Sequence, residues 1–291
     1  MSPDFEEVIE MGTPGINLQQ YLDRINFDGI PSANLQCLQQ LLTQHVRTIP
    51  FENATSFLGS PVDIELESIE AKLVQQKRGG YCYEQNALLG AALGPIGFKV
   101  TNLAARILWQ MPIGHQPAQS HMILMVELEG TRFLIDAGFG SNTLTAPLNV
   151  DSSDRQSTPH GVYRFTLIDD EYLLEVTTDS GWQPMYSFDL KPKTHGDYKI
   201  GSWYCSTHPE SRFVEHLIVA RSFPEGRHTL FNRQLSYQPL LGSKSVVMLA
   251  DVDELRATLL DIFGIELPAG REIDQKLGRI FESDRIAERV I

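Results

Sequence analysis

The sequence predicts an α+β protein, and three observations support this class. Apolar residues recur at helical spacing through the first third of the 291-residue chain. Short strand-like segments bounded by turn residues follow from about Lys99. The last third mixes both patterns. Because the strand-like segments are short and consecutive, we expect them to form a small barrel or sandwich beside the helices.

The first third contains four predicted helices. Three of them show an apolar stripe, at residues 16–25, 35–46 and 66–74. Ser32 or Asn34 stands just before the second stripe and would cap its N-terminus. The fourth helix, rich in Ala and Leu, is predicted from Cys82 to Leu93 and ends at Gly94-Pro95.

Strands are predicted through the middle of the chain. The segments are 99–110, 120–130, 131–138, 161–170, 171–178 and 184–190. Glu129-Gly130 and Asp169-Asp170 are turn signals that would join neighbouring segments as hairpins. The polar stretch 149–160 is expected to be a loop.

Further strands and two helices are predicted near the C-terminus. The strand-like segments are 213–223, 227–238 and 245–250. Asp251 would cap a helix that ends at Gly264, and a terminal helix is expected at 271–290.

Composition excludes several classes of protein. The formal net charge of −13 argues against nucleic-acid binding by a broad basic surface. No apolar run approaches the ~18 residues of a membrane span, and residues 1–12 lack the features of a secretory signal. Three cysteines in a chain of this length favour a reducing compartment, so we expect a cytoplasmic protein. The sequence has no CxxC or HExxH, so no metal site is expected.

The segment KRGGYCYEQN at residues 77–86 places a thiol in an unusual context. Cys37 and Cys205 lie in surroundings where a small buried side chain is the default interpretation. Cys82, in contrast, follows two glycines that permit a positive φ, and it stands at the predicted start of a helix. The positive end of that helix would lower the pKa of the thiol. We therefore expect Cys82 to be a nucleophile.

His121 and Asp136 are the predicted partners of Cys82. If Glu129-Gly130 is a two-residue turn, Leu128 pairs with Thr131, and Asp136 becomes the diagonal neighbour of His121 on the same face. A one-residue shift would separate the two side chains. An imidazole oriented by a carboxylate is the usual activator of a catalytic thiol. The alternative, a strand-end Asp136 that caps the following turn, stays open.

Several segments together resemble one known family, the arylamine N-acetyltransferases. Besides residues 78–86, they are SHMIL, LIDAGFG, IPFEN and WYCSTHPESRF, and they occur in family order and spacing. The resemblance extends from about residue 16 to residue 265. Ala137 and Tyr83 depart from the usual family residues, although neither belongs to the set Cys82, His121 and Asp136.

The resemblance implies a three-part fold. Residues 1–95 would form a helical bundle that carries the cysteine, residues 96–195 a β-barrel that carries the histidine and aspartate, and residues 196–291 an α/β lid with interdomain and C-terminal helices. It also implies a papain- or transglutaminase-like core. In that core Cys82 matches the acylated cysteine, His121 the imidazole and Asp136 the orienting carboxylate.

The resemblance further implies a ping-pong transfer of acetyl from acetyl-CoA, a co-substrate rather than a permanently bound cofactor, to arylamines, arylhydrazines or arylhydroxylamines. Phe139 is a candidate wall of the acceptor cleft, and Gly138 and Gly140 would permit close approach of a ligand. Phe213 would border the coenzyme entrance. Arg78 and Glu84 are expected to hold together the loop that leads into Cys82, residues 77–81, called the cysteine loop below. The protein would be a monomer or homodimer.

Three alternatives remain. A relative of the same family would use another acyl donor such as malonyl-CoA, or would act as an amide synthase. A cysteine amidase would release the acyl group to water. A binding protein would keep the triad as a relict.

Overall fold

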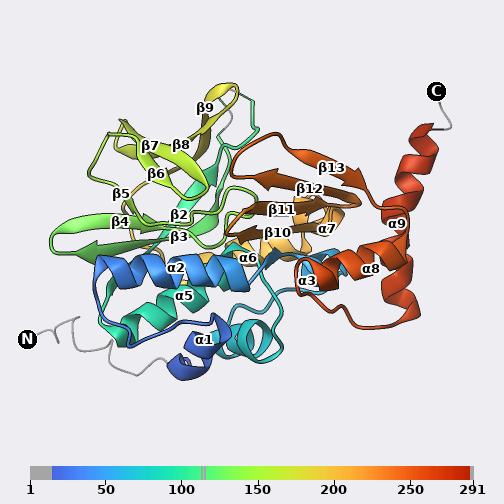
Figure 1. Ribbon diagram of the computed structural model, residues 1–291, viewed down its shortest axis with the longest axis horizontal. Coiled ribbons are helices and arrows are strands. Elements are labelled where there is room, and N and C mark those ends of the chain that lie inside the picture. The colour runs from blue at the N-terminus through green and yellow to red at the C-terminus, as the bar shows by residue number, and fades with distance from the viewer. Residues whose placement is uncertain (1–14, 113, 115, 289–291) are drawn as a thin grey trace, which may run out of the picture.

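The computed structural model describes residues 15–112, 114 and 116–288, with side chains to residue 282 (Figure 1). The expectation of no secretory signal at residues 1–12 therefore concerns residues outside this part. The last two residues of the predicted terminal helix also lie outside it.

The predicted N-terminal helices are present and are followed by the helix of Cys82. Asn34 caps the second of them, because its side chain accepts the Cys37 N–H at 2.9 Å. The helical elements are α1 (Leu18–Arg24), α2 (Leu35–Thr48), α3 (Ala54–Phe57), α4 (Leu66–Glu70), the π-helical η1 (Ala71–Gln75) and α5 (Cys82–Ile96).

The predicted end of α5 at Gly94-Pro95 is wrong. The helix includes Pro95 and ends at Ile96, and the following Gly97 caps it with a left-handed φ of 103°. The N–H of Gly97 bonds to the carbonyl of Gly94, and the N–H of Phe98 bonds to that of Leu93. Pro95 has no N–H to donate to the carbonyl four residues earlier, so α5 lacks one hydrogen bond in its last turn and still continues to Ile96.

Within the described residues, eight strands form one antiparallel sheet in the order β5-β4-β3-β2-β9-β8-β7-β6. Leu128 pairs with Thr131, so the register expected from the Glu129-Gly130 turn is confirmed. The strands are β2 (Lys99–Ile107), β3 (Gln119–Leu128), β4 (Thr131–Ile135), β5 (Leu148–Asn149), β6 (Gln156–Thr158), β7 (Gly161–Ile168), β8 (Glu171–Thr178) and β9 (Gly181–Phe188).

The two edges of this sheet come together, so that it is a nearly closed barrel. The Gln156 side chain accepts the Asn149 N–H at 2.7 Å and donates to the Asn149 carbonyl at 2.8 Å. This side chain takes the place of a backbone ladder between β5 and β6. The expectation that 149–160 is only a loop was therefore incomplete, because these edge strands occupy part of it.

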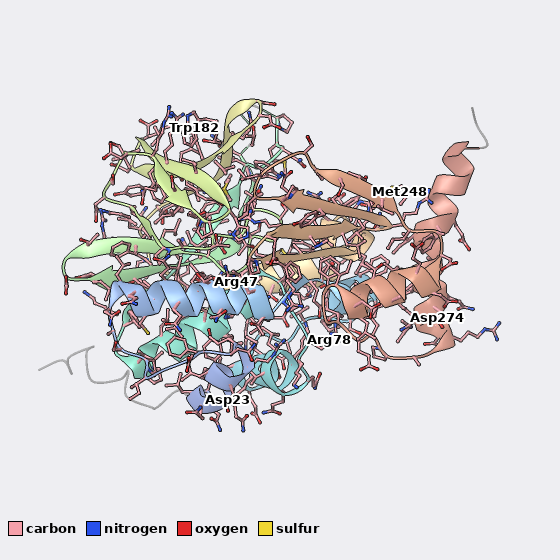
Figure 2. The ribbon with its side chains drawn as sticks, in the orientation of Figure 1. Asp23, Arg47, Arg78, Trp182, Met248 and Asp274 are labelled. Atoms are coloured by element: carbon pink, nitrogen blue, oxygen red, sulfur yellow. The ribbon has the colours of Figure 1, made fainter. Side chains whose placement is uncertain are left out.

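A second sheet in the described residues has the order β1-β10-β11-β12-β13. Its first strand, β1 (Phe51–Glu52), comes from the N-terminal part of the chain. The other strands are β10 (Ile218–Phe223), β11 (Gly226–Phe231), β12 (Gln234–Pro239) and β13 (Ser245–Met248). Figure 2 shows the two sheets side by side, with Trp182 on the barrel and Met248 on the outer strand β13.

Four helices complete the C-terminal half that the structure describes: α6 (His195–Thr207), α7 (Arg212–Glu215), α8 (Val252–Asp261) and α9 (Arg271–Glu288). Asp251 caps α8 as expected, accepting the Glu254 N–H. The start of the predicted strand 213–223 is instead the short helix α7. Helix α6 lacked a clear sequence signal, because its apolar Ile200 and Trp203 point to solvent.

Two hydrophobic cores hold these parts together. The larger joins α1, α2 and α5 to the eight-stranded sheet, and the smaller lies between the five-stranded sheet and helices α8 and α9. Among the described residues, no helix has both the length and the apolar character needed to cross a membrane.

Candidate active site

The cysteine loop is held by close backbone packing. A Cβ on Gly79 would lie 2.1 Å from the Pro50 carbonyl oxygen, so only glycine fits there. Neither Gly79 nor Gly80 has a positive φ, and the left-handed residue is Lys77 with φ 55°. The expected positive φ before the thiol is therefore wrong, because the glycines serve close approach instead.

Two ion pairs secure the same loop. Arg78 pairs with the buried Glu52 at 2.7 Å. Glu84 pairs with Lys72 at 2.7 Å and accepts the Tyr81 N–H, which fixes the first turn of α5. The expectation that Arg78 and Glu84 hold the loop together agrees with these contacts.

His121 and Asp136 are in direct contact. The side chains meet at 2.7 Å between Nε2 and Oδ2, and both are buried, with exposed fractions of 4% and 0%. The hydrogen bond deduced from the hairpin register is therefore present. Asp136 lies just beyond the end of β4, behind the imidazole.

Asn86 fixes the Asp136 loop from the side of α5, and sequence reasoning gave it no role. Its Nδ2 donates to Asp136 Oδ1 at 3.0 Å and to the Met122 carbonyl at 2.7 Å. Its Oδ1 accepts the Ala137 N–H at 2.9 Å. Asn86 lies four residues after Cys82, so both side chains share one face of α5, and that spacing was the available signal.

The Cys82 thiol lies at the junction of α5 with this loop. A Cβ on Gly138 would lie 2.5 Å from Cys82 Cα, so the glycine lets the Asp136 loop contact the helix start. The space beside Gly138 is therefore filled by atoms of Cys82 and Asn86 and not by a ligand. Gly140 has φ +89°, and Phe51 lies next to it.

Burial raises the pKa of the Cys82 thiol, and the nearby Cys205 thiol adds to this effect. The backbone N–H groups of Met122 and Tyr83 act in the opposite direction. The expectation of a lowered thiol pKa at the helix start is therefore wrong for the thiol on its own, because desolvation outweighs the amide donors. An unpaired thiolate is unfavourable here, so ionisation requires a proton acceptor within the site.

A cavity of about 410 Å³ opens onto the thiol. Cys82 and His121 both line it, whereas Asp136 lies behind the histidine. Of the predicted binding residues, Gly138, Phe139, Gly140 and Phe213 also line it.

Aromatic rings form much of the cavity wall. Phe139 stands edge-on to His121, with ring centroids 5.6 Å apart. Phe213 lies 5.8 Å from Tyr81 and 6.0 Å from Phe51. The described cavity lining contains one arginine, Arg212, and no carboxylate. Such a cavity suits a flat apolar ligand.

The IPFEN segment anchors one side of this cavity. The Asn53 side chain donates to the carbonyls of Phe213 and His216, both at 2.7 Å, and accepts the Ile218 N–H. One asparagine therefore joins α7 and β10 to the N-terminal part. Its role in placing Phe213 was not predicted.

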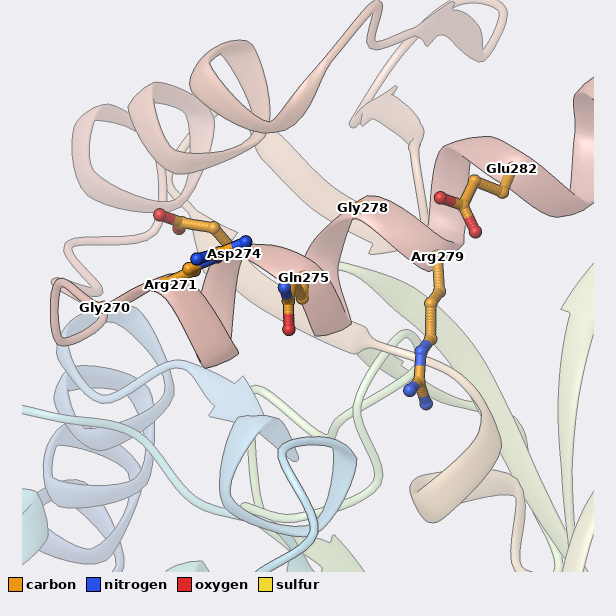
Figure 3. Close-up of a pocket in the computed structure, with 7 residues that line it drawn as sticks. All are labelled: Gly270, Arg271, Asp274, Gln275, Gly278, Arg279 and Glu282. Atoms are coloured by element: carbon orange, nitrogen blue, oxygen red, sulfur yellow. The ribbon is translucent and has the colours of Figure 1, made fainter.

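A larger hollow of about 740 Å³ runs along α9, away from the thiol (Figure 3). Its lining comes from Gly270 and one side of that helix and carries both charge signs, including Arg271 and Glu282. It joins no nucleophile to a base, so the cysteine cavity remains the candidate active site.

Comparisons with known proteins agree with this geometry. A family model described as N-acetyltransferase matches residues 34–272. The chain is 38% identical over 274 residues to the arylamine N-acetyltransferase of Mycolicibacterium smegmatis, an alignment that covers 92% of this chain and 99% of that protein.

Solved structures give the same result. The arylamine N-acetyltransferase of Mycobacterium marinum is 35% identical, with a TM-score of 0.88 over 91% of this chain and 99% of that one. The same protein in complex with CoA gives a TM-score of 0.87 with the same coverage and identity.

Proposed function

Because the chain belongs to the arylamine N-acetyltransferase family, we propose that it moves acetyl from acetyl-CoA to arylamine nitrogen through an acetyl-Cys82 thioester. The observation that carries this proposal is that Cys82 and His121 line one cavity, with Asp136 hydrogen-bonded behind the imidazole. Arylhydrazines and arylhydroxylamines present a similar neutral nucleophile and are further acceptors.

In the first half-reaction, His121 takes the proton of the Cys82 thiol. Burial disfavours a lone thiolate, so the anion forms as a pair with the imidazolium. The sulfur attacks the thioester carbonyl of acetyl-CoA, and CoA leaves with the proton from His121. Asp136 fixes the imidazole tautomer and stabilises its positive charge. One thioester replaces another, so the step is nearly thermoneutral.

In the second half-reaction, the amine nitrogen attacks acetyl-Cys82 and His121 takes the amine proton. The amide leaves, and the proton returns to sulfur. The backbone N–H of Cys82 stands at the first position of α5, where no helical acceptor is available to it. We assign it as a donor to the oxyanion in both halves.

Acetyl-CoA is a co-substrate in this scheme: its acetyl group passes to Cys82, and free CoA leaves before the amine reacts. The CoA complex of the similar M. marinum protein supports a CoA donor. We place the acyl end of the donor and the aromatic acceptor in the same cavity, against Phe139, and the coenzyme entrance near Phe213. The two ligands then use the site in turn, which gives ping-pong kinetics.

The test is acetyl-CoA turnover with and without an aromatic amine, on wild type and Cys82→Ala. We expect parallel double-reciprocal plots, acetylated Cys82 by intact mass when amine is absent, and no turnover by the variant. Turnover with malonyl-CoA and none with acetyl-CoA would show that malonyl-CoA is the acyl donor. Rapid release of free acetate without amine would point to a hydrolase.

A further inference from the structure

A chain of buried hydrogen bonds connects α1, α2 and α5 behind the cysteine loop. Tyr21 Oη lies 2.9 Å from His45 Nδ1, and His45 Nε2 lies 2.7 Å from Gln85 Oε1. All three side chains have an exposed fraction of 0%. The reaction scheme uses none of them.

Gln85 continues this chain to the backbone on both sides of the loop. Its Nε2 donates to the Pro50 carbonyl at 2.7 Å and to the Gly80 carbonyl at 3.2 Å. Gly80 in turn donates its N–H to Pro50, and its carbonyl accepts the Glu52 N–H. The Gln85 side-chain amide therefore joins the backbone at Pro50 to the backbone at Gly80, which lies two residues before Cys82.

The hydrogen-bond roles in this chain are fully determined. The Gln85 Nε2 hydrogens go to carbonyls, so its Oε1 must accept, and His45 must donate from Nε2. The Nδ1 of His45 then accepts from the Tyr21 hydroxyl. A neutral imidazole with the proton on Nε2 is the tautomer that satisfies every member, and burial favours that neutral form.

We propose that His45 and Gln85 are positioning residues for Cys82, which hold the 50–52 and 79–81 segments so that the thiol faces His121. They act through the backbone and touch no substrate. The proposal rests on the proposed function. Loss of Gln85 removes the side-chain donor shared by the Pro50 and Gly80 carbonyls, and loss of His45 leaves the buried Gln85 Oε1 without its donor, so in either case the loop relaxes. A shift of about 1 Å at a nucleophile lowers a rate steeply.

The experiment compares His45→Leu and Gln85→Leu with two references. His45→Gln keeps an amide donor close to the position of Nε2. Leu41→Ala opens a cavity one turn away on α2, at a buried side chain outside the hydrogen-bond chain. The readouts are kcat and KM for an aromatic amine, the rate of Cys82 alkylation by iodoacetamide, and the thermal midpoint.

We expect His45→Leu and Gln85→Leu to lower kcat and the Cys82 alkylation rate about ten-fold or more, with KM within about two-fold. His45→Gln should recover most of the loss. Leu41→Ala should lower the thermal midpoint comparably and keep the alkylation rate. If a leucine variant does not fold, Tyr21→Phe, which removes only the hydroxyl donor, should give a smaller loss in the same direction.

The proposal is overturned if the leucine variants alkylate and turn over like Leu41→Ala. It is also overturned if His45→Gln is as impaired as His45→Leu. The alkylation rate is measured without any substrate, so a wild-type protein that fails to transfer acetyl would refute the proposed function and leave this test intact.

Discussion

Single side chains at this site are fixed by contacts that leave no spare volume. Gly138 lies against Cys82 Cα and Asn86 Nδ2, and Asn86 bonds to three separate groups of the β3 and β4 segments. The thiol and the imidazole come from different elements, so the contacts of Gly138 and Asn86 between those elements help to set their relative position. A substitution of Gly138 tests the close packing at this contact, and a substitution of Asn86 tests its hydrogen bonds.

Gly138→Ala should lower both activity and stability. The new Cβ would meet Cys82 Cα at 2.5 Å, and neither backbone can move without moving the thiol. We expect a loss of about 2 kcal/mol in unfolding free energy and about ten-fold or more in kcat. Gly94→Ala is the matched control on α5, because nothing lies within 4 Å of its Cβ. Urea unfolding and steady-state kinetics compare the two, and equal activity would refute the packing argument.

Asn86→Ala removes the side-chain hydrogen bonds between α5 and the segments that carry His121 and Asp136, and it adds no volume. Asp136 Oδ1 keeps the Gly138 N–H as a donor, whereas the Ala137 N–H and the Met122 carbonyl lose their side-chain partner. We expect about 2–4 kcal/mol of destabilisation and a fall in kcat. The control Asn17→Ala deletes only the α1 cap and should cost about 1 kcal/mol with kcat unchanged. A wild-type kcat in Asn86→Ala would contradict this account.

Elements set by local patterns were predictable, whereas those set by tertiary packing were not. Glu129-Gly130 adopts positive φ at both residues, which fixes the β3–β4 register and the pairing of His121 with Asp136. Apolar periodicity did not predict helix α6, because the helix exposes Trp203 while burying small residues such as Ser202. The roles of Asn53 and Asn86 depend on partners distant in sequence, which no local pattern encodes.

The closure of the barrel also depends on one side chain. Gln156→Ala should free the Asn149 N–H and carbonyl at the β5–β6 seam. We expect about 1–2 kcal/mol lower stability and faster amide hydrogen exchange confined to β5 and β6. The exposed neighbour Ser157→Ala is the control. Unchanged exchange at the seam would show that the edges are held by other contacts.

At the scale of the whole molecule, the site is where separate parts of the chain meet. The cavity takes Cys82 from α5, His121 from β3, Phe139 from the loop after β4 and Phe213 from α7. Strand β1 and Asn53 tie the N-terminal part to the five-stranded sheet. The three-part organisation at 1–95, 96–195 and 196–291 remains a proposal, in which β1 would be the segment that links the first part to the third.

Acid should destabilise the whole fold through His45. Burial lowers the pKa of His45 to about 4, with the Arg24 cation adding to the effect and the Gln85 hydrogen bond opposing it. Tyr21 faces the other ring nitrogen. In the unfolded chain His45 has a pKa near 6.5. Between about pH 6.5 and about pH 4 it therefore binds a proton in the unfolded state and not in the folded state, so the stability of the fold decreases as pH drops through this range.

The expected contribution of His45 is about 3 kcal/mol across this window. Urea unfolding between about pH 7 and about pH 4.5 measures it, with His45→Gln as the reference that removes this titration alone. His160 and His228, whose pKa values burial also lowers, are present in both proteins. The variant should therefore show the shallower decline with acid. Equal declines would mean that Nδ1 of His45 accepts its proton without a cost from the Tyr21 hydroxyl that faces it, and the hydrogen-bond chain behind the cysteine loop would not be the acid-sensitive part of the molecule.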